Sequence, residues 1–132
     1  MKKKTIVIGT FDHEVYEHIC AKLGNSKYNV RFVQRGVKIL LEILDNEVDL
    51  LILDLELTGV MGIEILPVIR RLRPRLPVIL ITDDMNSKIR KLAAEMGVTY
   101  QAYKPMSTAE TQAIATATER LMERQMFEFA AL

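Results

Sequence analysis

Three polar residues stand where apolar stretches of this sequence end. Asp54 closes VDLLILD, Thr82 closes LPVILIT, and Lys104 follows VTYQAY. A buried carboxylate needs a partner, and a hydroxyl and an ammonium beside it form a site that suits a phosphate-sized anion. Each residue alone also has an ordinary structural role, because Asp54 can cap a loop, Thr82 can cap a helix and Lys104 can be a counter-ion. Their matching positions favour the anion site.

The elements that position these residues follow from the hydrophobic pattern. Short apolar runs bounded by turn signals predict strands over residues 5–9, 28–33, 48–54, 76–82 and 98–103, with helical periodicity after each. This alternation predicts an α/β fold, a five-stranded parallel sheet in flavodoxin-like order 2-1-3-4-5 with helices on both faces. Ligands of such sheets bind beyond the carboxyl ends of the strands, where Asp54, Thr82 and Lys104 all lie.

Capping residues mark the first and the last helix. Asp12 is expected to cap the first helix, which Gly24 ends. Ser107 and Glu110 form a capping-box pattern, which predicts a last helix that starts at Ser107.

The second and third helices carry less usual features. The second is expected to place Val37, Leu40, Leu41 and Leu44 on one apolar face. Pro67 lies inside the third, which predicts a kink or a late start. Four arginines at the end of that helix predict a solvated basic terminus rather than a docking patch: Arg70, Arg71, Arg73 and Arg75.

Composition limits the classes of protein to consider. The chain has 132 residues, 49% hydrophobic and 27% charged, which is typical of one globular domain. A net charge of +1 predicts no nucleic-acid partner for the chain by itself and no membrane surface. The single cysteine, Cys20, excludes an internal disulfide, and no signal peptide or membrane span is evident; a cytoplasmic location is expected.

The stretch VDLLILDLELTGVMGIEILPVIRRLRPRLPVILIT at 48–82, together with YKP at 103–105, resembles the receiver domains of two-component response regulators. The resemblance extends from Thr5 to about Met122. It implies a phosphorelay signalling module rather than an enzyme, with Asp54 as phospho-acceptor and with Thr82 and Lys104 binding the phosphoryl oxygens. It also implies a histidine kinase or phosphotransfer protein as partner, besides other signalling proteins.

The chain departs from this family where the family binds magnesium. Receivers normally end the first strand with two acidic residues, whereas here Gly9 and Thr10 stand there and offer at most one neutral oxygen. Asp54 and Glu56 remain as candidate metal ligands, although Glu56 also fits a solvated loop position, and Asp12 fits a helix cap. Magnesium binding is therefore predicted to be weak, and phosphorylation at Asp54 weak or absent.

The family's switch positions also differ. The aromatic residue expected three before the lysine is Gln101 here, between Tyr100 and Tyr103. Asp83 follows Thr82 where a small residue is usual, and with Asp84 it can either repel a phosphate or cap the next helix.

Three alternatives to a phosphorylated receiver stay open. The first is a phosphorylation-independent pseudo-receiver. The second is a haloacid-dehalogenase-like phosphohydrolase, because LLILDLELT resembles that family's motif, although there the nucleophile strand comes first. The third is a flavodoxin-like cofactor binder, against which the first strand lacks a phosphate loop.

The end of the chain carries more apolar surface than the final helix of a receiver can bury by itself. We expect residues 1–125 to form the receiver-like domain and residues 126–132 to be an apolar C-terminal extension or linker stub. The apolar side chains of this end are expected to be exposed on the single domain and covered by a second copy in a homodimer or by a missing partner segment: Met122, Met126, Phe127, Phe129 and Leu132.

Overall fold

The computed structural model describes residues 3–24, 27–56, 62–82 and 87–131, with side chains as far as Gln125. All pairs of neighbouring strands are parallel, and the strand order is β2-β1-β3-β4-β5, which confirms the predicted fold. The elements are β1 (Thr5–Gly9), α1 (His13–Leu23), β2 (Asn29–Val33), α2 (Gly36–Asp45), β3 (Leu50–Asp54), α3 (Gly62–Leu72), β4 (Val78–Thr82), α4 (Ser87–Glu95), β5 (Tyr100–Tyr103) and α5 (Thr108–Ala131).

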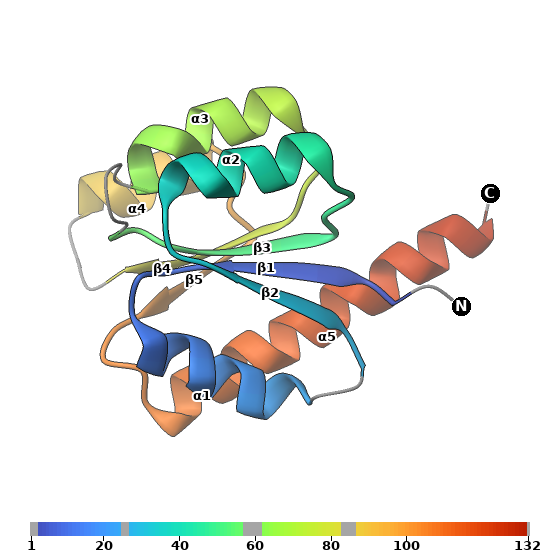
Figure 1. The fold of residues 1–132 in the computed structure, drawn as a ribbon, viewed down its shortest axis with the longest axis horizontal. Coiled ribbons are helices and arrows are strands. Elements are labelled where there is room, and N and C mark those ends of the chain that lie inside the picture. The colour runs from blue at the N-terminus through green and yellow to red at the C-terminus, as the bar shows by residue number, and fades with distance from the viewer. Residues whose placement is uncertain (1–2, 25–26, 57–61, 83–86, 132) are drawn as a thin grey trace.

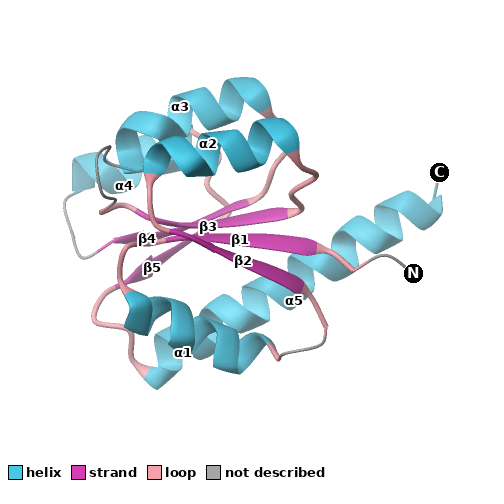
Figure 2. Cartoon of the chain, in the orientation of Figure 1, coloured by secondary structure: helices cyan, strands magenta, loops and turns pink. Residues whose placement is uncertain are grey.

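The sheet lies between two layers of helices. Figure 1 shows α2, α3 and α4 on one face and α1 and α5 on the other. Strand residues alternate between the two faces: Leu51 and Leu53 of β3 join the α2–α3–α4 side, whereas Leu50 and Ile52 join the α1–α5 side. The twisted strands in Figure 2 are therefore covered on both sides, which explains their continuous apolar sequences.

The carboxyl ends of the five strands fall where the sequence predicts them. The amino ends of β2 to β5 lie one or two residues later than predicted. Tyr28 and Leu76, for example, are buried although they precede the paired residues. An apolar run therefore predicts which residues are buried. Hydrogen bonding to the neighbouring strand begins later, where the two backbones come together.

The predicted caps are present with one difference. Asp12 Oδ1 accepts hydrogen bonds from the backbone N–H groups of Glu14 and Val15, at 3.0 and 3.5 Å, and so caps α1. Ser107 Oγ accepts the N–H of Glu110, so Ser107 caps α5, which begins at Thr108. The carboxylate of Glu110 does not complete the capping box but accepts the Tyr103 N–H of β5 at 3.3 Å.

The predicted apolar face of α2 is wrong for three of its four residues, since only Leu40 packs, partly buried, against the core. Ile39 and Ile43 are the fully buried apolar side chains of this helix, whereas Val37, Leu41 and Leu44 are about half exposed. The charged residues Lys38, Glu42 and Asp45 mark one side of α2 as polar, but apolar residues occupy all its other sides, so the pattern alone leaves open which of them are buried. The position of α2 over β1 selects the face of Ile39 and Ile43.

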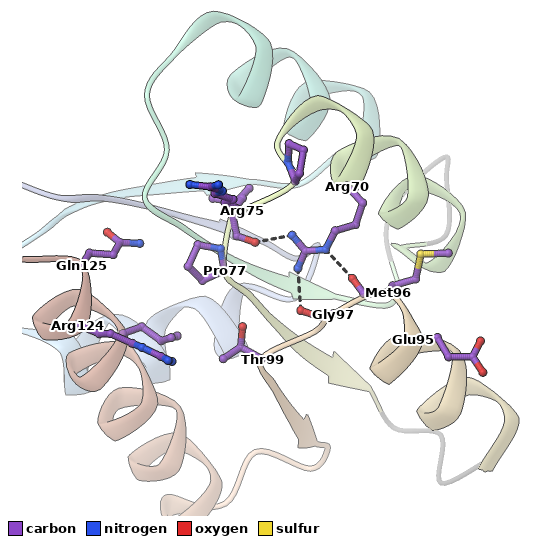
Figure 3. A pocket seen from close by; sticks show the side chains of 12 residues that line it. Arg70, Arg75, Pro77, Glu95, Met96, Gly97, Thr99, Arg124 and Gln125 are labelled. Carbon is purple, nitrogen blue, oxygen red and sulfur yellow. Dashed lines mark hydrogen bonds between the residues drawn. The ribbon is translucent and has the colours of Figure 1, made fainter. Parts of the chain in front are cut away.

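The end of α3 also differs from the prediction of a solvated terminus. The guanidinium of Arg70 donates to the backbone carbonyls of Met96, Leu76 and Gly97 at 2.6, 2.5 and 2.9 Å, as Figure 3 shows. Burial lowers the pKa of Arg70. Arg73 donates to the Ile43 carbonyl of α2 at 2.9 Å. These two arginines thus tie α3 to both neighbouring helices.

Pro67 lies within α3, which already begins at Gly62, so the expected late start is not observed. The last helix, α5, has 24 residues and extends beyond the amino ends of the strands in Figure 1. Met122 of α5, expected to be exposed, is instead buried in the core between α5 and the sheet. Gln125 Nε2 donates to the Asp49 carbonyl at 3.1 Å and anchors α5 near the amino end of β3. In the described part of the chain, no helix combines the length and apolarity needed to cross a membrane.

Candidate functional site

The site is centred on Asp54, the last residue of the central strand β3. Its side chain is 1% exposed. Gly62 allows the start of α3 to approach this point, because a Cβ there would lie 2.9 Å from Leu55 Cα and 3.0 Å from the Asp54 carbonyl oxygen. Asp54 is therefore held between two strands and the first turn of a helix.

Three groups satisfy the Asp54 carboxylate. Lys104 Nζ lies 2.7 Å from Oδ2, and Thr10 Oγ1 donates to the same oxygen at 2.8 Å. The Glu56 N–H donates to Oδ1 at 3.1 Å. Hydrogen bonds with an ionised partner are among the strongest in proteins, so these three donors hold the buried carboxylate in place.

Lys104 reaches Asp54 because β5 ends beside β4. The Lys104 N–H donates to the Thr82 carbonyl at 2.9 Å, in line with the pairing of Thr82 and Tyr103. Its ammonium also lies 5.8 Å from the centre of the Phe11 ring, and its side chain is 15% exposed. The predicted proximity of Asp54 and Lys104 is observed directly. Thr82, buried at the end of β4, is joined to Lys104 through the backbone.

Thr10 is a site residue that the sequence identified only as a missing acid. It is fully buried, and its hydroxyl donates to Asp54 while accepting the Asp12 N–H at 3.0 Å. The signal for this role was its position, since a hydroxyl directly after the first strand meets the end of the third in a parallel sheet.

Gly9 shows how the structure accommodates the missing acid beside Thr10. A Cβ at this position would overlap with Ile39 Cδ1, so the side chain of α2 fills the space above the end of β1. An acidic residue at position 9 would require Ile39 to move.

The residues present do not fit a typical magnesium site. Asp12 is used as a helix cap, and the site contribution the structure shows for Glu56 is its backbone N–H. The ammonium of Lys104 already faces Asp54 Oδ2. Within the described ranges, His, Cys, Asp and Glu side chains nowhere gather in groups of three that could hold a metal ion. Magnesium prefers several carboxylate and water oxygens in octahedral geometry, and Asp83 and Asp84 lie outside the described residues.

Gln101, the predicted switch position, faces α4. Its Nε2 donates to the Arg90 carbonyl at 3.1 Å. Among the described residues, its Oε1 is the buried side-chain oxygen that has no hydrogen-bond partner. The neighbouring phenol of Tyr100 is partly desolvated, which together with Glu110 and Tyr103 raises its pKa. Gln101 thus links β5 to α4 by a polar contact.

Among the hollows on the described part of the chain, two lie at opposite ends of the strands. One of about 450 Å³ borders the site and is lined by residues of α1 and of the β5–α5 turn, including Asp12, His18, Lys104 and Met106. The other, of about 400 Å³, lies beside Arg70 at the amino end of β4 and is shown in Figure 3. The first hollow gives solvent and small solutes a route to Lys104.

The chain is similar to known proteins in sequence and in fold. The family model of the response regulator receiver domain matches residues 12–116. Curated proteins give no match. Among solved structures, the CheY-like receiver domain protein from Methanospirillum hungatei JF-1 has a TM-score of 0.81 at 21% identity, covering 95% of this chain and 98% of that chain.

Two further solved structures are equally similar in fold. The signal receiver domain of an HD domain-containing protein from Pseudomonas fluorescens Pf-5 gives a TM-score of 0.82 at 22% identity, with 95% of this chain and 98% of that chain covered. DrrB of Thermotoga maritima, an OmpR/PhoB homolog, gives 0.80 at 22% identity, with 94% and 54% covered. At these identities the likeness concerns the fold.

Proposed function

Because the chain belongs to the response regulator receiver domain family, we propose that it is a two-component signalling module that acts through protein–protein contacts and is phosphorylated only weakly at Asp54. The observation that carries this proposal is the pairing of Asp54 Oδ2 with both Lys104 and Thr10. Receiver domains in general serve signalling rather than catalysis, and their partners are histidine kinases or phosphotransfer proteins.

Phosphorylation requires Asp54 to become a free nucleophile. A carboxylate oxygen attacks the phosphorus of the donor, a new P–O bond forms, and the bond from phosphorus to the leaving group breaks, with its electrons going to that group. The contact of Lys104 with Asp54 supports a role for its ammonium in neutralising the phosphoryl oxygens. A metal would supply further charge neutralisation when bound, but Thr10 and Gly9 supply no carboxylate for it.

A phosphorylation-independent pseudo-receiver is the second candidate. It is favoured by the closed Asp54–Lys104 ion pair and by Gln101, whose amide is bonded to the α4 backbone instead of carrying an aromatic ring that could change position. In this form the β4–α4–β5 surface keeps one conformation, and partner binding is constitutive. The phosphohydrolase alternative is not retained, because the receiver model accounts for residues 12–116.

The remaining parts of the proposal concern location and assembly. We expect the protein to act in the cytoplasm, where histidine kinases present their phosphoryl groups. The C-terminal residues 126–132 are proposed as an apolar extension that contacts a second copy or another segment.

Intact-mass spectrometry after incubation with acetyl phosphate tests this function. With millimolar magnesium, we expect at most a small fraction of the chain to gain one phosphoryl group, labile to base and hydroxylamine as an acyl phosphate is. Asp54→Asn is the control, and it should remove any gain. Rapid and complete magnesium-dependent modification of the unaltered chain would overturn weak phosphorylation, and a gain that persists in Asp54→Asn would overturn the site.

A further inference from the structure

Helix α2 exposes an apolar stripe that the fold leaves uncovered. Val37, Leu41 and Leu44 are 54%, 49% and 52% exposed, and their spacing of four and three residues places them on one side of the helix. Val68 of the neighbouring helix α3 is 43% exposed. Contiguous exposed apolar side chains of this size mark an interaction surface more often than isolated ones do.

The charges of α2 are reversed relative to its dipole. Arg35 and Lys38 stand at its amino end, Asp45 is its last residue, and the helix has neither an acidic residue in its first turn nor a basic one in its last. The helix dipole favours the opposite arrangement. All three side chains are exposed, so the arrangement costs stability in the isolated domain, and the described part of the chain shows no hydrogen bond or ion pair that these side chains make.

A second α2 in antiparallel orientation accounts for both features. We propose that two copies of this chain associate through α2, with the stripe of each helix packed on the stripe of the other. About a two-fold axis near Leu41, Val37 of one copy faces Leu44 of the second, and Lys38 faces Asp45 of the second. Each positive amino end then meets a negative carboxyl end, and the two helix dipoles oppose each other.

The register of this pairing follows from the positions on the helix. Lys38 and Asp45 are seven residues apart, so they lie on the same flank of the stripe. In an antiparallel pair the same flanks face each other, which brings two symmetric Lys38–Asp45 contacts together. The net charge of +1 adds little repulsion between copies.

The α2 surface is separate from the C-terminal helix α5. Figure 1 shows α2 on the face of the sheet opposite to α5, so an α2 interface leaves the C-terminal extension free. It does, however, adjoin the candidate site, because Ile39 of α2 fills the space above Gly9. The inference does not depend on phosphorylation of Asp54.

Sedimentation equilibrium of the full chain tests the apolar part. We expect concentration-dependent dimers of the unaltered chain, and an association constant at least about tenfold lower for Leu41→Gln. Leu92→Gln is the matched control, since Leu92 is an exposed leucine of α4, 38% exposed, and it should leave association unchanged. A chain that is monomeric at several hundred micromolar, or association unaffected by Leu41→Gln, overturns the proposal.

Charge reversal tests the orientation. Lys38→Glu and Asp45→Lys should each weaken self-association, about tenfold, because both contacts become repulsive. An equimolar mixture of the two variants should form heterodimers at least as well as the unaltered chain, since every contact between them is again attractive. Circular dichroism checks that all variants remain folded. Mixtures no more associated than the separate variants overturn the antiparallel arrangement.

Discussion

The ammonium of Lys104 lies 2.7 Å from Asp54 Oδ2, and the carboxylate it faces is 1% exposed. An ion pair this deeply buried offsets the cost of removing both charges from water only while both partners are present. The same contact that holds the ends of β3 and β5 together also neutralises the carboxylate that would have to react. Stability and reactivity of the site are therefore coupled through these two residues.

Removal of the lysine should reveal this coupling. Lys104→Met leaves a buried carboxylate without its cation, and we expect the free energy of unfolding to fall by about 1–3 kcal/mol. Adding Asp54→Asn should recover part of the loss, because it removes the unpaired charge. Urea denaturation of the four chains in this cycle measures the coupling. Lys27→Met, which removes an exposed pair with Glu119, should change stability by less than about 1 kcal/mol; additive effects at Lys104 and Asp54 would contradict the argument.

Restoring an acid at position 10 should create magnesium affinity. Thr10→Asp places a second carboxylate beside Asp54, so we expect about 1–3 kcal/mol lower stability without metal. Millimolar magnesium should then stabilise the variant by linkage, whereas the unaltered chain should respond little. Denaturation with and without magnesium measures both effects.

Thr10→Asn is the control for this variant, because it has nearly the same size without the charge. It should show no stabilisation by magnesium. The substitution is made at position 10 because a side chain at position 9 would displace Ile39. Equal magnesium responses of the Asp, Asn and unaltered chains would show that the acidic pair is not what limits metal binding.

Arg70 should stabilise the domain more than its neighbours in sequence. Arg70→Met removes three hydrogen bonds to the carbonyls of Met96, Leu76 and Gly97, and we expect a loss of about 2–3 kcal/mol, since the freed carbonyls regain water only in part. The control is Arg71→Met, because Arg71 is exposed. This substitution should change the free energy of unfolding by less than about 0.5 kcal/mol. Similar losses for both would assign the effect to charge alone.

Shortening the chain tests the apolar extension. A chain that ends at Gln125 keeps the hydrogen bond of Gln125 to the Asp49 carbonyl, so its midpoint of urea unfolding should stay unchanged. Its self-association, followed by light scattering, should be weaker than that of the full chain, because burial of large apolar side chains favours association. If both chains associate equally and are equally soluble, residues 126–132 are not an interface.

Much of the fold could be predicted because its signals are local. Alternating apolar runs and helical periods determined five parallel strands and their order, and the turn signals after each run located the carboxyl ends of the strands. Asp54 and Lys104 follow those ends, so their proximity could be predicted as well. The aspartate cap at Asp12 is likewise a local feature and is observed.

Contacts between distant residues had no such signal. Thr10 and Asp54 are 44 positions apart, and Arg70 and Met96 are 26 apart. Polar hydrogen bonds of this kind depend on where a side chain points once the helices have packed. Periodicity does not encode that direction, so the sequence predicts neither the hydrogen bond of Thr10 to Asp54 nor the contacts of Arg70 with backbone carbonyls.

The sequence by itself determined the arrangement of this protein as a parallel sheet between two layers of helices. It also determined that the candidate site lies at the carboxyl ends of the strands. Only the tertiary structure decided which apolar residues of α2 are buried, because Lys38, Glu42 and Asp45 mark only one side of the helix as polar and leave apolar residues on all the others. Ile39 packs over Gly9 and Ile43 is buried with it, whereas Val37, Leu41 and Leu44 remain exposed. The local pattern predicts that the helix packs against the sheet, and the residues of the neighbouring strand determine which side of the helix is buried.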